Sequence, residues 1–169
     1  MTPEEISDQV LQMGKQARTA AHALTKLSSE RKNEILLAMA DAVMAREAEI
    51  LEANGKDLAA AEEMGLTVAM QDRWRLDPAR LAAMAQGIRD VALLHDPSGE
   101  LIREWSRPNG LKIRKQRTPI GVIGIIFESR PNVTADAAVL CFKTGNATIL
   151  RGGKEAIHSN RAIAAALQE

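Results

Sequence analysis

The chain has 169 residues and carries equal numbers of basic and acidic side chains, 22 of each. This balance gives no reason to expect binding to nucleic acid or to an anionic membrane surface. Aromatic residues make up only 2% of the chain, which argues against a surface that stacks single-stranded bases. A hydrophobic fraction of 46% and a charged fraction of 26% are typical of a globular protein.

The single cysteine, Cys141, excludes an intrachain disulfide and fits a reducing compartment. No apolar run approaches the roughly 18 residues that a membrane-spanning helix needs. The N-terminal segment MTPEEISDQV is acidic and lacks the apolar core of a signal peptide. We therefore expect a cytoplasmic protein that does not enter the membrane.

Residues 1–100 have the apolar spacing of a helical region. The first helix is expected to begin at Thr2, because Thr-Pro-Glu-Glu supplies an N-cap, a proline at the first helical position and a capping glutamate. A second helix is expected to begin after Ser28-Ser29 and to end at Asn54-Gly55, which tolerate positive φ. Three shorter helices are predicted at residues 56–64, at 68–74 and from Asp77-Pro78 onwards.

Residues 101–118 contain two alternating stretches on either side of Pro108-Asn109-Gly110. Asn-Gly favours a tight turn because both residues accept positive φ, so a β-hairpin is predicted. We regard this hairpin as a candidate oligomerisation element. Its second strand is basic, which is typical of a sheet edge that discourages aggregation, with anion binding as the alternative. The basic residues are Lys112, Arg114, Lys115 and Arg117.

Residues 119–169 predict a strand at 121–127, a helix at 134–143, a strand at 147–150 and a further helix. This order is typical of a parallel sheet with right-handed crossovers, so the fold class is α/β. Two strands that are apolar on both faces cannot bury themselves. We therefore expect an incomplete sheet, and a chain that is part of a larger protein.

Polar loops follow both predicted parallel strands: FESRPN begins at Phe127, and RGGKE begins at Arg151. Ligands of open parallel sheets bind at the carboxyl ends of the strands. Gly152 and Gly153 would allow close backbone approach, and the helix after them would present free amides to an anion. The alternative is an ordinary strand-to-helix turn. Neither a P-loop nor a G-x-G-x-x-G fingerprint is present.

The remaining candidates for chemistry are weaker. Cys141 lies on an apolar helical face without a neighbouring histidine, so we expect a structural residue rather than a nucleophile. The histidines share no ligand spacing with one another or with Cys141, and we therefore expect no metal site. They are His22, His95 and His158.

Several segments together resemble one family of enzymes. TPIGVIGIIFESRPNVT and KTGNATILRGGKEA, with the upstream LDPARLAAMAQGIRDVALLHDPSGE and LEANGKDLAAA, look like the gamma-glutamyl phosphate reductases of the aldehyde dehydrogenase superfamily. The resemblance covers nearly the whole chain, and the combination of FESRPNVT with ILRGGKEA is specific. It implies a Rossmann-like sheet and NADPH-dependent reduction of L-glutamyl 5-phosphate to L-glutamate 5-semialdehyde with phosphate release, a step of proline biosynthesis. It also implies a homo-oligomer and an association with glutamate 5-kinase.

The resemblance assigns the polar loops to cofactor and substrate. The implied cofactor-binding residues are Phe127, Glu128, Ser129, Arg151, Gly152, Gly153 and Lys154. Arg151 falls where relatives use a lysine against the adenosine ribose. Lys154 falls where relatives that prefer NAD often place a glutamate, and a cation there suits the 2′-phosphate of NADPH. Arg130 falls where many members carry an oxyanion-stabilising asparagine, and Asn132 is a second candidate for substrate or oxyanion contact.

The resemblance also implies that the catalytic cysteine lies in a separate domain beyond Glu169, because Cys141 does not correspond to it. We therefore expect residues 119–169 to be the first part of an NADPH-binding sheet, the catalytic domain to be absent, and the chain to be inactive alone. One alternative is a non-catalytic nucleotide-binding or partner-completed interaction module. Another is an aldehyde-oxidising dehydrogenase, which FESRPN favours less because it replaces the Trp-Asn loop usual there.

Overall fold

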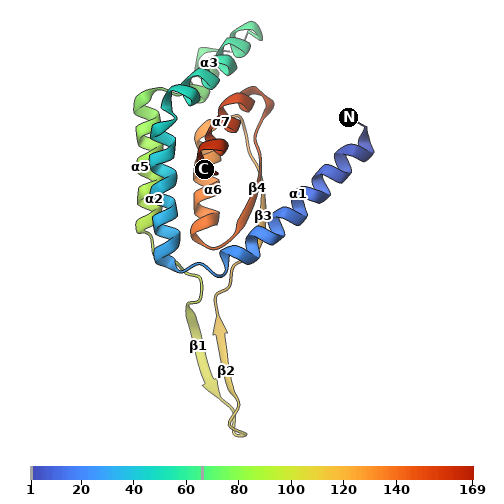
Figure 1. Cartoon of the computed structure of the whole chain (residues 1–169), viewed down its shortest axis with the longest axis vertical. Helices are drawn as coiled ribbons and strands as arrows, with labels where there is room; N and C mark the ends of the chain where they lie inside the picture. Colours follow the sequence, from blue (N-terminus) through green and yellow to red (C-terminus); the bar gives the residue numbers. More distant parts are fainter. Residues whose placement is uncertain (1, 66) are drawn as a thin grey trace.

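A computed structural model of the protein describes residues 2–65 and 67–169 (Figure 1). Helices α2 and α5 lie side by side, and α6 and α7 lie between this pair and the parallel strands β3 and β4. Helix α1 contacts β4 and β3 and runs outward to the N-terminus. The helices are α1 Pro3–Leu24, α2 Ser29–Ala45, α3 Glu47–Glu63, α4 Val68–Trp74, α5 Pro78–Leu93, α6 Pro131–Lys143 and α7 Ile157–Leu167.

The predicted starts of the first helix and of the helix at Asp77-Pro78 are confirmed by their caps. Thr2 Oγ1 accepts a hydrogen bond from the amide of Glu5 at 3.2 Å, and the Glu5 carboxylate accepts one from the Thr2 amide at 2.7 Å. The Asp77 carboxylate accepts the amide of Arg80 at 2.7 Å and so caps α5. These contacts satisfy amides that the first helical turn leaves without a partner.

The predicted helix end at Asn54-Gly55 is wrong. The helical region is interrupted earlier, at Arg46, which separates α2 from α3. Asn54 and Gly55 both lie inside α3. The separate helix predicted at residues 56–64 is the second half of α3. Gly55 has no positive φ. Sequence spacing alone misplaced the break because an asparagine can end a helix or pack within one.

Asn54 stays helical because its side chain is fully used in tertiary contacts. Its Nδ2 atom donates to the carbonyl of Trp74 at 2.8 Å and to Oγ of Ser159 at 3.0 Å. Its Oδ1 atom accepts the amide of Leu76 at 2.8 Å. A buried amide with three partners does not compete for the backbone of its own helix. Asn54 therefore ties α3 to α7 and to the segment after α4.

The core lies among α2, α3, α5, α6 and α7. Full burial of one large aliphatic side chain stabilises the fold by about 1.5–3 kcal/mol. The outer half of α1 contributes little, since Ile6 and Val10 are 49% and 62% exposed. The fully inaccessible members of the core include Leu36, Val43, Ile50, Leu81 and Ile163.

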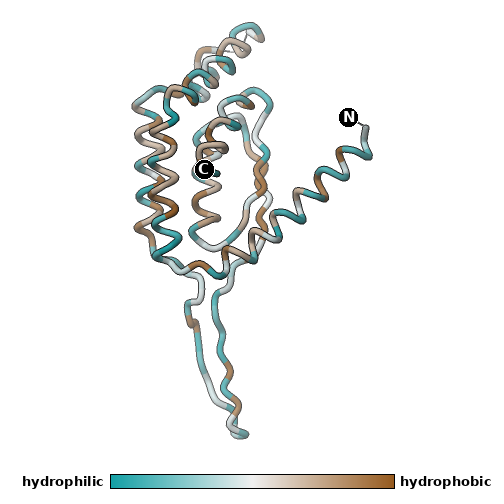
Figure 2. Tube along the Cα trace, viewed as in Figure 1, coloured by the Kyte–Doolittle hydropathy of each residue, from teal (hydrophilic) through white to brown (hydrophobic). Residues whose placement is uncertain are grey.

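The predicted hairpin is confirmed. Strands β1 (Leu101–Ser106) and β2 (Lys112–Gln116) pair in antiparallel register, and Gly110 in the turn has φ 84°. The hairpin projects away from the helices, and Figure 2 shows that most of it is hydrophilic. Arg114 pairs with Glu104 across the strands. The basic strand thus forms a charged sheet edge, and its role in oligomerisation stays a prediction.

The α/β class is confirmed by the last third of the chain. Strands β3 (Val122–Ile126) and β4 (Ala147–Arg151) are parallel neighbours that α6 connects. Helix α6 begins at Pro131, three residues before its predicted start, because proline suits the first helical position. Within the described residues this sheet has two strands, and Ile126 is 79% exposed. None of the helices that the structure describes is apolar over the length needed to cross a membrane.

Candidate functional site

The loops after β3 and β4 lie against each other at the carboxyl ends of the strands. The amide of Phe127 donates to the carbonyl of Arg151 at 3.0 Å, which extends the ladder by one bond. Beyond it, Oγ of Ser129 donates to the Glu155 carboxylate at 2.5 Å, and this bond lowers the pKa of Glu155 below its ordinary value. The structure therefore brings together the two segments that the sequence singled out.

The two glycines of the second loop are required for this packing. A Cβ atom on Gly152 would lie 2.3 Å from Nδ2 of Asn160 and 3.0 Å from Cζ of Phe127. On Gly153 it would lie 2.0 Å from Oγ of Ser129. Any larger residue would force the side chains of Asn160, Phe127 or Ser129 to move. Close packing between the loops thus explains both glycines, and their contact with a cofactor stays a prediction.

The amides expected at the start of the last helix are not free. Asp57, which is buried in α3, accepts the amides of His158 and Ser159 at 3.2 and 2.8 Å. It also accepts the hydroxyl of Ser159 at 2.6 Å. The prediction that this helix offers free amides to an anion is therefore wrong for these two groups, because a carboxylate from α3 caps them.

Two cations remain available at the strand ends. The side chains of Arg151 and Lys154 are exposed, and neither forms an ion pair with any residue that the structure describes. Glu128 is also exposed, Phe127 is half-buried and Ser129 is buried. Two unpaired cations beside the carboxyl ends of parallel strands fit the phosphate groups of a dinucleotide.

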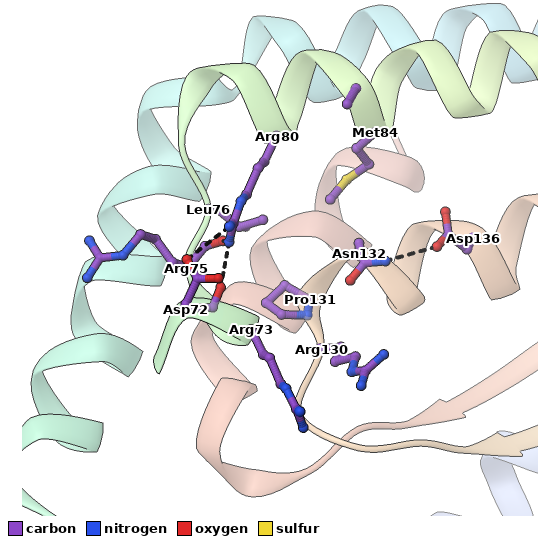
Figure 3. Close-up of a pocket in the computed structure, with 11 residues that line it drawn as sticks. Asp72, Arg73, Arg75, Leu76, Arg80, Met84, Arg130, Pro131, Asn132 and Asp136 are labelled. Atoms are coloured by element: carbon purple, nitrogen blue, oxygen red, sulfur yellow. Dashed lines mark hydrogen bonds and ion pairs between the residues drawn. The ribbon is translucent and has the colours of Figure 1, made fainter. Parts of the chain in front are cut away.

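Arg130 and Asn132 line a different feature, a cleft of about 530 Å³ between α4, the start of α5 and the start of α6 (Figure 3). Buried Pro131 and Met84 form part of its wall. Arg130 precedes α6 as its N-cap residue, and Asn132 lies in the first turn. The charged residues that line the cleft are Asp72, Arg73, Arg75, Arg80, Arg130 and Asp136.

One of the four arginines holds the cleft together. The Arg80 guanidinium donates to the carbonyls of Asp72 and Arg75 at 2.5 and 2.8 Å and pairs with the Asp72 carboxylate at 3.0 Å. It thereby closes the C-terminal end of α4 against the start of α5. Among the described residues, Arg73, Arg75 and Arg130 have no carboxylate partner. The cleft therefore keeps an excess of positive charge.

The opposite side of the cleft carries one carboxylate. Asp136, one helical turn after Asn132, accepts a hydrogen bond from Asn132 Nδ2 at 3.2 Å. Loss of hydration in the cleft raises the pKa of Asp136 above its ordinary value, and the bond from Asn132 opposes this rise. Sequence reasoning missed Asp136 and Arg73. The arginines of DRWRLDPAR and the spacing of Asn132 and Asp136 were the available signals.

Cys141 and the histidines do not form a further candidate site among the described residues. Cys141 is buried in α6, which fits a structural residue, and His158 is exposed. Among the described residues, no three histidine, cysteine or acidic side chains gather as a metal site would require.

Comparison with known proteins places this arrangement in a family. Residues 2–169 match the model of the Aldehyde dehydrogenase family, and the chain belongs to that family. Membership implies a nicotinamide cofactor.

The chain is, more narrowly, a homologue of gamma-glutamyl phosphate reductases. It is 55% identical over 164 residues to the reductase of Geobacter metallireducens, covering 97% of this chain and 39% of that protein. It is 54% identical over 157 residues to the reductase of Mesorhizobium japonicum, covering 93% of this chain and 37% of that protein. The chain thus spans less than half the length of these relatives.

Solved structures show the same likeness. The gamma-glutamyl phosphate reductase of Thermotoga maritima superposes with a TM-score of 0.91 and 41% identity, over 94% of this chain and 38% of that one. The gamma-glutamyl phosphate reductase of Saccharomyces cerevisiae superposes with a TM-score of 0.83 and 40% identity, over 92% of this chain and 40% of that one. A probable aldehyde dehydrogenase of Listeria monocytogenes superposes with a TM-score of 0.66 and 17% identity, over 95% of this chain and 34% of that one. At this identity the likeness supports the fold alone.

Proposed function

We propose that this chain supplies the NADPH-binding and part of the substrate-binding surface for reduction of L-glutamyl 5-phosphate to L-glutamate 5-semialdehyde with release of phosphate. The observation that carries the proposal is the pair of strand-end loops. In a chain that is 55% identical to a gamma-glutamyl phosphate reductase, these loops interlock and leave Arg151 and Lys154 exposed without ion pairs among the described residues.

The proposed cofactor surface consists of Phe127, Glu128, Ser129, Arg151, Gly152, Gly153 and Lys154. The interlocked loops hold the backbone in one geometry, so a bound dinucleotide would meet a pre-ordered surface. Lys154 is the proposed contact of the 2′-phosphate, because an unpaired ammonium group can form a charge-assisted hydrogen bond with a phosphate oxygen. When bound, the cofactor supplies the hydride. The residues of this chain bind and orient it.

Arg130 and Asn132 are the proposed contacts of substrate or of the developing oxyanion. The unpaired guanidinium of Arg130 can bind an acyl phosphate, and fixed donors stabilise charge that develops during reduction. The single cysteine is buried in α6, so no thiol of this chain faces the cleft. We propose that the chain alone does not catalyse the reaction, and that the active protein is a cytoplasmic homo-oligomer that associates with glutamate 5-kinase.

Lys154→Glu tests the cofactor assignment through binding rather than turnover. The substitution should weaken NADPH binding by roughly tenfold to a hundredfold and leave NADH binding nearly unchanged. Titration calorimetry of both cofactors on the wild-type chain and the variant measures the effect. Lys112→Glu on the hairpin makes the same charge change away from the strand ends and is the matched control. Equal losses for both cofactors would contradict the 2′-phosphate role.

Turnover tests the reaction itself. L-Glutamate 5-semialdehyde, phosphate and NADP⁺ should yield NADPH with the Geobacter metallireducens reductase as the positive control, and none with this chain. Formation of NADPH by this chain would overturn the assignment of Cys141 as structural, and Cys141→Ser would then show whether that thiol reacts.

A further inference from the structure

The cleft of Figure 3 separates its charges in a way that suits a particular ligand chemistry. Arg73 and Arg130 both extend below Pro131 in this view, whereas the guanidinium of Arg75 points away from the cleft residues. Asp136 lies beyond Asn132, on the far side from Arg73. Unpaired cations at one end and a carboxylate at the other complement a small molecule that carries both signs of charge.

The fold keeps these groups apart from one another. Asp72 already neutralises Arg80 at the edge of the cleft. Asn132, an uncharged donor, occupies the hydrogen-bond position beside Asp136, so this carboxylate has no cationic partner among the residues that the structure describes. Asp136 is exposed at the cleft and loses only part of its hydration there. A carboxylate at the cleft without a cationic partner favours an ammonium group brought by a ligand.

We propose that Asp136 is a specificity-determining residue that binds the α-ammonium group of an amino-acid substrate, while Arg73 and Arg130 bind its anionic groups. This inference rests on the proposed function and deepens it. It assigns recognition of the amino-acid end of the substrate to the cleft between α4, α5 and α6. It assigns the cofactor to the strand-end loops.

The test compares two ligands that differ in the ammonium group. L-Glutamate carries it, and glutarate lacks it but keeps two carboxylates. The wild-type chain should bind L-glutamate more tightly than glutarate, by on the order of fivefold for a partly exposed ion pair. Asp136→Asn should abolish this preference by weakening L-glutamate alone. Two-dimensional NMR titration of the labelled chain gives both dissociation constants, and the amide signals of α6 report the site.

The chain offers matched controls. Asp90 accepts a hydrogen bond from Gln86, four residues earlier on α5, at 2.8 Å, which reproduces the arrangement of Asn132 and Asp136 outside the cleft. Asp90→Asn should therefore keep the preference for L-glutamate. Arg73→Gln should weaken both ligands, whereas Arg107→Gln, which removes the same charge on the hairpin outside the cleft, should weaken neither.

Each contrary result has a distinct meaning. Absence of binding, no preference in the wild type, or an unchanged preference in Asp136→Asn would overturn this inference. None of these outcomes affects the discrimination between NADPH and NADH by Lys154, which tests the proposed function separately. Conversely, a lost cofactor preference with an intact L-glutamate preference would refute the cofactor assignment and leave the amino-acid subsite standing.

Discussion

The helical core and the two β-sheets of this chain are stabilised to very different degrees. Leu36, Leu81 and Ile88, on α2 and α5, are inaccessible or nearly so, and five helices pack around them. The sheets are each two strands wide within the described residues, and Ile126 at the end of β3 is 79% exposed. Figure 2 separates the two sheets from each other: the hairpin is mostly hydrophilic, whereas β3 and β4 are coloured as apolar.

This difference indicates that the helices stabilise the fold and that the sheets carry the residues proposed to bind ligands. The helices bury enough apolar surface to hold their positions, and they carry the residues that brace the site, such as Asp57 and Arg80. The sheets contribute their ends and edges, where polar loops and unpaired cations lie. Substitutions in the core should therefore affect stability, and substitutions in the sheets should mainly affect binding.

The largest effect expected is from a cavity in the core. Leu81→Ala removes a fully buried side chain of α5 and should lower the free energy of unfolding by about 2–5 kcal/mol. Ile126→Ala, at an exposed strand position, should change it by less than about 0.5 kcal/mol. Urea unfolding followed by circular dichroism measures both. Similar losses in the two variants would contradict the contrast between core and sheet.

The next effect concerns the capping of α7. Asp57→Ala leaves the amides of His158 and Ser159 without their carboxylate and should cost about 2–3 kcal/mol. Asp41→Ala removes an exposed partner of Arg89 and should cost less than about 1 kcal/mol. The same unfolding assay compares them. If Asp57→Ala were as mild as its control, this tertiary cap would not stabilise the fold.

A third effect should appear at the seam between the helices and the hairpin. Asp96 there pairs with buried Lys32 and accepts hydrogen bonds from the amide of Ser98 and the hydroxyl of Ser29, both at 2.9 Å. Burial alone would raise the pKa of Asp96, but the bonds from Lys32, Ser98 and Ser29 outweigh it and lower the pKa from 3.8 to about 2.

Because the folded-state pKa of Asp96 is depressed, its contribution is present above the unfolded-state pKa and is lost as pH falls from about 4 to about 2. The contribution is about 2 kcal/mol. Unfolding free energies measured across this window should fall for the wild-type chain by that much more than for Asp96→Asn. Parallel pH profiles for the two proteins would exclude this role of the carboxylate.

The smallest effect should come from the hairpin. Glu104→Ala removes the exposed cross-strand partner of Arg114 and should cost less than about 1 kcal/mol, a loss that added salt should reduce. Unfolding at low and high ionic strength measures the difference. A loss above 2 kcal/mol would show that the hairpin stabilises the chain as the core does.

Local features of this protein could be predicted from the sequence by itself. The caps at Thr2 and Asp77, the turn at Asn109-Gly110 and the β-α-β order all follow from neighbouring residues. The polar loops at Phe127 and Arg151 could be placed at one sheet edge, because parallel strands end on the same side. Resemblance to relatives then supplied the roles proposed for those loops.

Only the tertiary structure decided the features that depend on residues far apart in the chain. From its own neighbours in the sequence, Asn54 could end a helix. Its hydrogen bonds with Trp74 and Ser159 instead keep it inside α3. The first amides of α7 could bind an anion by their position in the sequence. In the fold, the carboxylate of Asp57, about a hundred positions earlier, accepts two of them. The cleft lies between α4, α5 and the start of α6, and no pattern of neighbouring residues predicts that these helices pack together. Burial and hydrogen bonding act between neighbours in space, so the identities of those neighbours fixed the outcome.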